Sequence, residues 1–185
     1  MEKRISILGA SGSVGKQALD VAESSGYKLD IISAEKNVAA IESAIRRHSP
    51  RLAFMSDESA ARDLKIRVSD TDTKVFGGCD LAEFLCENLD SDTVVNAISG
   101  YHGLAPTLAV IDRGARLALA NKESLVIAGD VVMRAAKEKN AEIKLFFHCC
   151  LRKSSGFKPG SRYFSRTNRL RTITPPVSAR SKGRR

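Results

Sequence analysis

The sequence predicts an α/β fold built on a doubly wound parallel sheet, followed by a basic segment without regular structure. Two observations carry the fold. Short apolar runs alternate with segments of helical periodicity from Arg4 to Phe147, as in repeated strand–helix–strand units. Three glycines, Gly9, Gly12 and Gly15, directly follow the first apolar run, where such a unit turns from strand into helix.

Seven strands are expected from the apolar runs: Arg4–Leu8, Leu29–Ser33, Leu52–Met55, Lys74–Phe76, Thr93–Ala97, Arg116–Ala120 and Ile143–Phe147. Six helices are expected between them: Ser13–Ser24, Val38–His48, Glu58–Leu64, Leu81–Asn88, Leu104–Arg113 and Ser124–Lys139. The first helix is expected to bury one apolar face, formed by Val14, Ala18, Val21 and Ala22. This alternation implies right-handed crossovers and a parallel sheet.

Charge is distributed unevenly along the 185 residues. The net charge is +9, yet residues 144–185 hold twelve Lys or Arg and no Asp or Glu. Residues 1–143 therefore hold 18 of the 30 basic residues and all 21 acidic ones, a net charge of −3. The change of composition predicts a nucleotide-binding domain over residues 1–147 and a basic tail over 148–185. The tail is rich in Ser, Arg, Lys, Gly and Pro, which is typical of disorder.

Composition also argues against several protein classes. No stretch approaches 18 consecutive apolar residues, so no membrane span is expected. No apolar secretory segment follows Met1, and the four cysteines form no CxxC pair. We therefore expect a cytoplasmic protein with reduced thiols and no metal site built from cysteines.

The glycine turn predicts a phosphate-binding site in a Rossmann-like fold. Gly12 leaves room for a pyrophosphate, and Gly15 lets the helix pack closely on the strand. The N–H groups of the first helical turn lack intrahelical partners and attract anions. Ser11 and Ser13 are expected to donate hydroxyl groups to phosphate oxygens, although a serine here is also a common helix cap.

The end of the second strand is where a dinucleotide site distinguishes its riboses. An acidic residue there favours NAD, and a basic residue accommodates the 2′-phosphate of NADP. Glu35 and Lys36 offer both, while Ser33 and Asn37 add neutral donors. The residues leave the choice between NAD and NADP open and favour NADP, because Lys36 and the two neutral donors lie together. A solvated charged turn is the alternative.

Two later strand ends carry further candidates. A segment of small residues with two glycines, 96–103, lies at the end of the fifth strand and suits close approach of a ligand, with His102 expected at the surface. Asn121, Lys122, Glu123 and Ser124 follow the sixth strand. Lys122 is placed to meet a phosphate or a carbonyl group, and Ser124 is expected to bind a ligand or to cap the next helix.

Four segments in this order resemble the cofactor-binding domain of the 1-deoxy-D-xylulose 5-phosphate reductoisomerase family. They are residues 9–15 (GASGSVG), 36–38 (KNV), 49–51 (SPR) and 119–126 (LANKESLV). The last segment is the most specific to that family. The resemblance extends over about residues 3–143.

The resemblance implies NADPH as cofactor and 1-deoxy-D-xylulose 5-phosphate as substrate. The family rearranges this substrate and reduces it to 2-C-methyl-D-erythritol 4-phosphate in the non-mevalonate route of isoprene biosynthesis, with Mg²⁺ or Mn²⁺, as a homodimer. By resemblance, four consecutive residues would hold the NADPH phosphates, namely Ser11, Gly12, Ser13 and Val14. Glu35, Lys36 and Asn37 would lie at the adenosine ribose. Asn121 and Glu123 would contact the cofactor, and Lys122 would reach the substrate.

The sequence departs from the family in two places. Glu35 stands where the family often has glycine, and its carboxylate would repel a 2′-phosphate unless it turned outward. The family also continues with a Pro-Val-Asp-Ser-Glu-His type motif that binds the metal, whereas no acidic residue follows Glu142 here. His148, Cys149 and Cys150 cannot replace oxygen ligands for Mg²⁺ or Mn²⁺.

We therefore expect a truncated reductoisomerase chain that is inactive alone and has no catalytic residue and no metal ligand. The homodimer of the family is not expected to be retained. A frameshift or gene-model error would explain the replaced continuation. Two alternatives remain open from the residues. One is a nucleotide-binding module whose basic tail binds nucleic acid, which the scarcity of aromatic residues disfavours. The other is a different NAD(P)-dependent Rossmann dehydrogenase, which the segment 119–126 disfavours.

Overall fold

The structure, a computed structural model, describes residues 3–145 and 171–173. In chain order its elements are β1 (Arg4–Leu8), α1 (Ser13–Ser24), β2 (Lys28–Ala34), α2 (Val38–His48), β3 (Leu52–Met55), α3 (Glu58–Arg67), β4 (Lys74–Gly77), α4 (Leu81–Asn88), β5 (Thr93–Asn96), the 3₁₀ helix η1 (Tyr101–Gly103), α5 (Leu104–Asp112), β6 (Arg116–Leu119), α6 (Lys122–Glu138), β7 (Ile143–Leu145) and β8 (Arg171–Ile173). The strand order is β4-β3-β2-β1-β5-β6-β7-β8.

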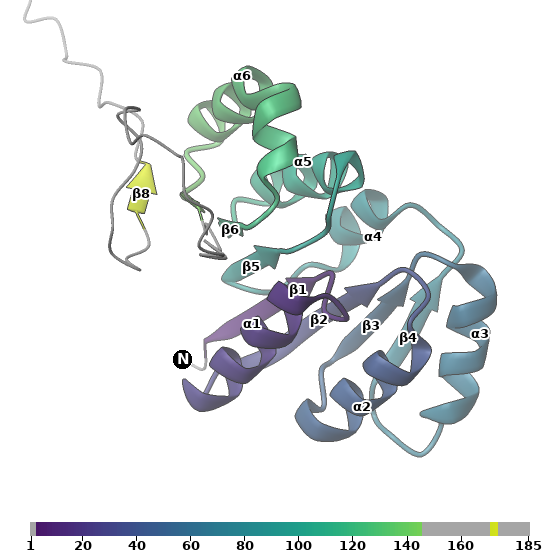
Figure 1. Cartoon of the computed structure of the whole chain (residues 1–185). Coiled ribbons are helices and arrows are strands. Elements are labelled where there is room, and N and C mark those ends of the chain that lie inside the picture. The colour runs from purple at the N-terminus through teal and green to yellow at the C-terminus, as the bar shows by residue number, and fades with distance from the viewer. Residues whose placement is uncertain (1–2, 146–170, 174–185) are drawn as a thin grey trace, which may run out of the picture.

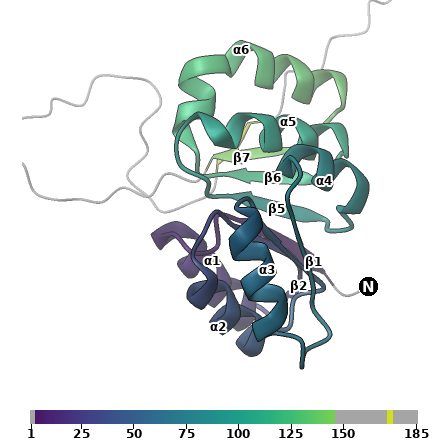
Figure 2. The same ribbon diagram turned by 90° about the vertical axis from the view of Figure 1, so that its right-hand side faces the viewer.

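The sheet is parallel from β4 to β7 and is covered on both faces by helices. All pairings among these strands are parallel, and β8 joins β7 in the antiparallel sense. Helices α1, α2 and α3 cover one face, and α4, α5 and α6 cover the other (Figures 1 and 2). This is the predicted doubly wound α/β fold, and the prediction is confirmed.

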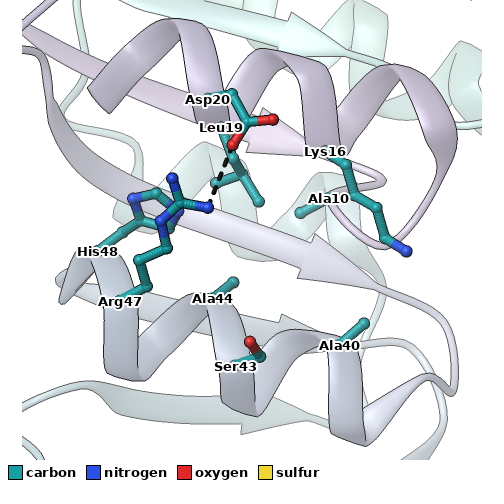
Figure 3. Close-up of a pocket in the computed structure, with 9 residues that line it drawn as sticks. All are labelled: Ala10, Lys16, Leu19, Asp20, Ala40, Ser43, Ala44, Arg47 and His48. Carbon is teal, nitrogen blue, oxygen red and sulfur yellow. Dashed lines mark hydrogen bonds and ion pairs between the residues drawn. The ribbon is translucent and has the colours of Figure 1, made fainter. Parts of the chain in front are cut away.

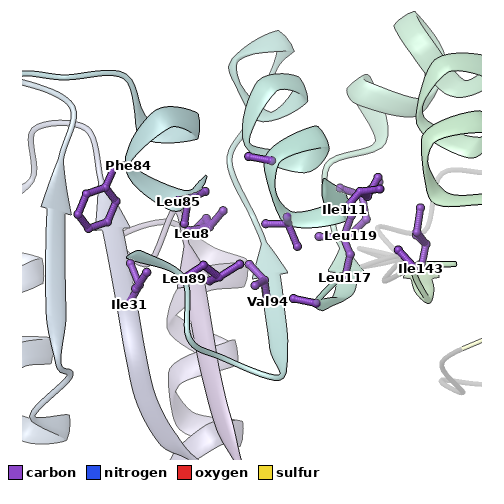
Figure 4. Packing of buried hydrophobic residues seen from close by; sticks show 14 of the residues in the cluster. Leu8, Ile31, Phe84, Leu85, Leu89, Val94, Ile111, Leu117, Leu119 and Ile143 are labelled. Atoms are coloured by element: carbon purple, nitrogen blue, oxygen red, sulfur yellow. The ribbon is translucent and has the colours of Figure 1, made fainter. Parts of the chain in front are cut away.

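Each face of the sheet has its own apolar core. Ile7 and Leu8, which are adjacent on β1 and fully buried, belong to opposite clusters because successive side chains of a strand point to opposite faces. The cluster under α4, α5 and α6 gathers Phe84, Val94 and Leu117 (Figure 4). Burying each Leu, Ile or Phe of this kind contributes about 1.5–3 kcal/mol. Strands buried on both faces read as nearly continuous apolar runs, which is why β3 has four buried residues in a row.

An ion pair with one buried partner fastens the sheet at the end opposite the strand C-termini. Asp30 on β2 has a fully buried carboxylate, and Nε of Arg51 lies 2.6 Å from its Oδ1. The same carboxylate accepts the N–H of Asp90, and Arg51 donates to the carbonyl of Asn88. The loop before β5 is thereby tied to β2 and β3. This arrangement was not foreseen from the sequence.

Several sequence expectations differ from the structure. Among the element bounds, α3 extends to Arg67 instead of ending at Leu64, and α6 begins at Lys122 instead of Ser124. The buried residues of α1 are Gly15, Leu19 and Ala22, whereas Val21 is 62% exposed, so the expected apolar face is wrong at that residue. β8 was not predicted, since the basic segment has no strand periodicity. The rest of the expected disordered tail lies outside the described residues, as do His148, Cys149 and Cys150. In the described part of the chain, no helix has the length and apolar character to cross a bilayer.

Candidate functional site

The candidate site lies at the C-terminal edge of the sheet, where the strand order reverses between β1 and β5. From β1 the chain continues to β2 on one side, and β5 continues to β6 on the other. The loops after β1 and β5 therefore leave toward opposite helix layers, and open α/β sheets bind their ligands in the crevice at such a point. The candidate residues predicted from the sequence follow β1, β2 and β6, so all lie at this edge.

The glycine turn after β1 uses each of its three glycines differently. Gly9 has a φ of +78°, and a Cβ there would lie 2.8 Å from the carbonyl oxygen of Ala97. A Cβ on Gly15 would lie 2.2 Å from the carbonyl oxygen of Gly9, which fixes the close contact of α1 with the turn. A Cβ on Gly12 would meet only the Gly9 oxygen at 3.4 Å, an ordinary contact. Gly9 and Gly15 are therefore required by the fold, whereas Gly12 faces open space.

Hydrogen bonds hold this turn to both neighbouring strands. The N–H groups of Gly9 and Ala10 donate to the hydroxyl and carbonyl oxygens of Ser33, at 3.3 and 2.8 Å. On the other side, Ala97 N–H donates to the carbonyl of Leu8. Ser33 is buried, and its hydroxyl oxygen supports the turn by accepting the N–H of Gly9. The expectation that it offers a donor to a ribose is not met.

The N-terminus of α1 differs from those of the other helices that directly follow strands. The side chains of Asn37, Asp57, Asp80 and Asn121 cap α2, α3, α4 and α6. α1 begins at Ser13 with Gly12 in the cap position, and no side chain of the described residues caps it. Within that part of the chain, the hydroxyls of Ser11 and Ser13 also have no hydrogen-bond partner, so serine capping does not occur. The free N–H groups and the positive end of the helix dipole form a seat for an anion.

The residues after β2 and β3 form a charged corner beside this seat, which we call the ribose corner: Glu35, Lys36, Asn37 and Asp57. Nζ of Lys36 lies 4.0 Å from a carboxylate oxygen of Glu35 and 4.0 Å from one of Asp57. Asn37 Oδ1 accepts the N–H of Ala40 and so begins α2. The pKa of Asp57 is lowered, first by the hydroxyl of Ser59 and then by the N–H of Ala60, so its carboxylate stays charged at neutral pH.

Two buried asparagines shape the loop after β5. Asn96 Nδ2 donates to the carbonyl of Gly103 and to the hydroxyl of Thr107, both at 2.9 Å. Asn121 Nδ2 donates to the carbonyls of Ile98 and Gly100, at 2.5 and 2.7 Å. Both amides are thereby committed to positioning this loop. Asn96 lies in the segment singled out at the end of the fifth strand but was assigned no role from the sequence, although a polar residue that ends an apolar strand was a usable signal.

The turn after β6 presents three side chains in different settings. Lys122 is exposed and has no ion-pair partner among the described residues, and Glu123 is partly exposed. Ser124 is fully buried, and its hydroxyl has no hydrogen-bond partner in the described part of the chain. Asn121, through a 2.7 Å bond from the Ser124 N–H, is the helix cap. The expectation that Ser124 might cap α6 is therefore wrong.

A groove of about 290 Å³ runs between α1 and α2 beside the glycine turn (Figure 3). At its far end, Arg47 pairs with Asp20 and Glu23. Lys16 stands at the near end, and its ammonium points away from Arg47, past the start of α2 (Figure 3). Among the described residues Lys16 has no ion-pair partner, so it adds a free positive charge to the edge that carries the anion seat.

No group of three or more His, Cys, Asp or Glu side chains within residues 3–145 is arranged to hold a metal ion. The acidic motif that Mg²⁺ requires is also missing from the sequence after Glu142. The side chains in the described part of the chain therefore do not fit a divalent metal site.

Comparison with known proteins gives one consistent family. Residues 5–129 match the family model described as 1-deoxy-D-xylulose 5-phosphate reductoisomerase. The reductoisomerase of Desulfitobacterium hafniense strain Y51 is 43% identical over 137 residues, which cover 73% of this chain and 36% of that protein. The chain thus spans little more than a third of the length of the curated relatives it matches.

Solved structures agree with this result. The reductoisomerase of Zymomonas mobilis in complex with NADPH superposes with a TM-score of 0.73 at 33% identity, covering 79% of this chain and 39% of that one. A DOX-P reductoisomerase in complex with NADPH, fosmidomycin and magnesium gives 0.71 at 34% identity, covering 78% and 36%.

Proposed function

The chain belongs to the 1-deoxy-D-xylulose 5-phosphate reductoisomerase family, and on that premise we propose that it binds NADPH at the C-terminal edge of its sheet. The observation that carries the proposal is the uncapped N-terminus of α1 beside Gly12. Of the helices that directly follow strands, this one alone in the described part of the chain leaves its first turn open to an anion.

In this proposal the cofactor phosphates rest on the first turn of α1. The main chain of Ser13 and Val14 supplies N–H donors at the start of α1, whereas Gly12, whose own N–H donates to the carbonyl of Gly9, leaves room for the phosphates. Ser11 and Ser13 supply hydroxyls that have no protein partner among the described residues. Because the turn is already fastened to β2 and β5, binding requires little rearrangement.

The adenosine end of NADPH would lie at the ribose corner. Lys36 supplies the positive charge, and the side chain of Glu35 beside it is mostly exposed to solvent. The amide nitrogen of Asn37 is available to the cofactor, because the amide oxygen caps α2. At the other end of the cofactor, Glu123 provides a polar contact. Asn121 would act through its main chain, because its side-chain amide is used by the loop after β5.

The exposed ammonium of Lys122 would reach the substrate, 1-deoxy-D-xylulose 5-phosphate, whose phosphate and hydroxyl oxygens are acceptors. NADPH would supply the hydride that reduces the rearranged substrate. The acidic metal ligands of the family have no counterpart in the residues after Glu142. We therefore propose that residues 1–147 form the cofactor-binding domain, and that this 185-residue chain on its own binds NADPH without turning over substrate.

Titration calorimetry with NADPH tests the proposal, with Gly12→Ala as the diagnostic variant. The new methyl group fits without a clash but occupies the anion seat, so we expect NADPH affinity to fall at least tenfold while the chain remains folded. Gly129→Ala is the matched control, because a Cβ there meets open space in α6, far along the chain from the seat. Absence of NADPH binding by the unmodified chain, or equal binding by both variants, would refute the proposal.

A further inference from the structure

The position of Lys36 in the ribose corner is set by two carboxylates from different strands. Glu35 is its neighbour in sequence, while Asp57 follows β3, and each places a carboxylate oxygen 4.0 Å from Nζ. Counting Glu35, Lys36 and Asp57 together, the corner carries a net charge of −1. A positive charge that stood alone here would instead be free to meet a phosphate.

Asp57 is held more firmly than Glu35. Its Oδ1 accepts the N–H of Ala60 and the hydroxyl of Ser59, and its own N–H donates to the carbonyl of Glu35. Its side chain is 29% exposed, compared with 78% for Glu35. Oδ2 therefore remains directed at Lys36 at a position fixed by α3 and by the end of β2.

Resting on the proposed cofactor site, we propose that Asp57 is a positioning residue for cofactor selection. With Glu35, it holds the ammonium of Lys36 and so lowers the preference of this chain for the 2′-phosphate of NADPH over the 2′-hydroxyl of NADH. The 2′-phosphate is a dianion, so the partial neutralisation of Lys36 by the two carboxylates disfavours it. The neutral 2′-hydroxyl of NADH is hardly affected.

Solvent limits the size of this effect. All three side chains are at least partly exposed, so their interactions are screened by water and salt. Unit charges about 4 Å apart in water interact by about 1 kcal/mol, which corresponds to roughly a fivefold change in affinity. We expect removal of the Asp57 charge to raise the ratio of NADPH to NADH affinity about three- to tenfold.

The test measures dissociation constants of NADPH and NADH for the full chain and for Asp57→Asn. Asparagine caps helices as well as aspartate does, so this variant removes the charge and keeps the start of α3. Glu58→Gln is the matched control, since Glu58 is the next residue but pairs with Arg62 instead of Lys36. We expect less than a twofold change in the affinity ratio for this control.

The variant Lys36→Met tests whether Asp57 acts through Lys36. If Asp57 acts through Lys36, Asp57→Asn should change the ratio no more than Glu58→Gln does when both are made in the Lys36→Met background. The inference is overturned if Asp57→Asn matches Glu58→Gln in the unmodified background, or keeps its full effect without Lys36. A chain that binds neither dinucleotide would refute the cofactor proposal itself and this inference with it.

Discussion

Replacing Asn121 with aspartate is expected to destabilise the domain strongly, although the change exchanges only an amide nitrogen for an oxygen. Aspartate can still cap α6 by accepting the N–H of Ser124. The second oxygen, however, would stand where Nδ2 now donates to the carbonyls of Ile98 and Gly100, at 2.5 and 2.7 Å. The side chain is only 2% exposed, so water cannot compensate.

The magnitude follows from these contacts. Two hydrogen bonds are lost, and two carbonyl oxygens face a third oxygen in a buried site, each costing about 1–3 kcal/mol. We expect the free energy of unfolding to fall by about 3–5 kcal/mol at pH 7, a large part of the 5–15 kcal/mol that is typical of a domain. The introduced carboxyl of residue 121 would have a raised pKa when folded. The loss should therefore be smallest at acid pH, and should grow as the pH rises through that folded pKa.

Urea denaturation of the two variants Asn121→Asp and Asn37→Asp provides the assay. Asn37 also caps a helix through Oδ1, but its side chain is exposed and its Nδ2 has no hydrogen-bond partner among the described residues. The control should change stability by less than about 0.5 kcal/mol, or increase it slightly, because a negative charge suits a helix N-terminus. Equal losses for both variants would show that the buried amide does not hold the loop, contrary to this reasoning.

Three further predictions concern stability. Gly15→Ala should lower the free energy of unfolding by about 2–4 kcal/mol in urea denaturation, because its Cβ would meet the turn backbone at 2.2 Å; a loss below 1 kcal/mol would contradict this. Ser124→Ala should be neutral or stabilising by up to about 1 kcal/mol, since it removes a buried hydroxyl without a partner in the described structure; a clearly lower melting temperature would argue for a hidden partner. Hydrogen bonding by Arg46 lowers the pKa of Asp70. The contribution of the Asp70 carboxylate to the stability of the fold is therefore present at neutral pH and is lost as the pH falls through that lowered pKa. The melting temperature, measured between pH 3 and pH 7, should therefore decrease less toward acid pH for Asp70→Asn than for the unmodified chain.

The layout of the fold was predictable because its periodicity is strong. The bounds of β1, α1, α2, β3 and α4 agree with expectation at both ends. Apolar runs mark the strands, Asn37 and Asp80 cap α2 and α4, and the glycine turn marks the start of α1. Val21 was misassigned because the sequence shows which residues are apolar but not how the helix is rotated on the sheet. The close contact between Gly15 and the turn, which leaves no room for a Cβ, limits this rotation, and it arises only in the tertiary structure.

The site was predictable in its location and less so in its chemistry. Parallel strands bring their C-terminal ends to one edge, so the prediction of a parallel sheet was enough to place Gly12, Lys36 and Lys122 at that edge. The direction of each polar side chain could not be. Ser33 turns inward to the glycine turn, and Asp57 reaches Lys36 from a strand that sequence reasoning left without a role.

The hydrogen bonds that fasten the glycine turn also bear on how quickly a ligand is captured. The turn loses its conformational freedom when the domain folds, through bonds to Ser33 on one side and through the contact of Leu8 with Ala97 on the other. A ligand that reaches the edge then meets donors already in place and waits for no loop to close. Association should therefore be governed by encounter and by the charges around the crevice, whereas residence time should report the quality of the contacts.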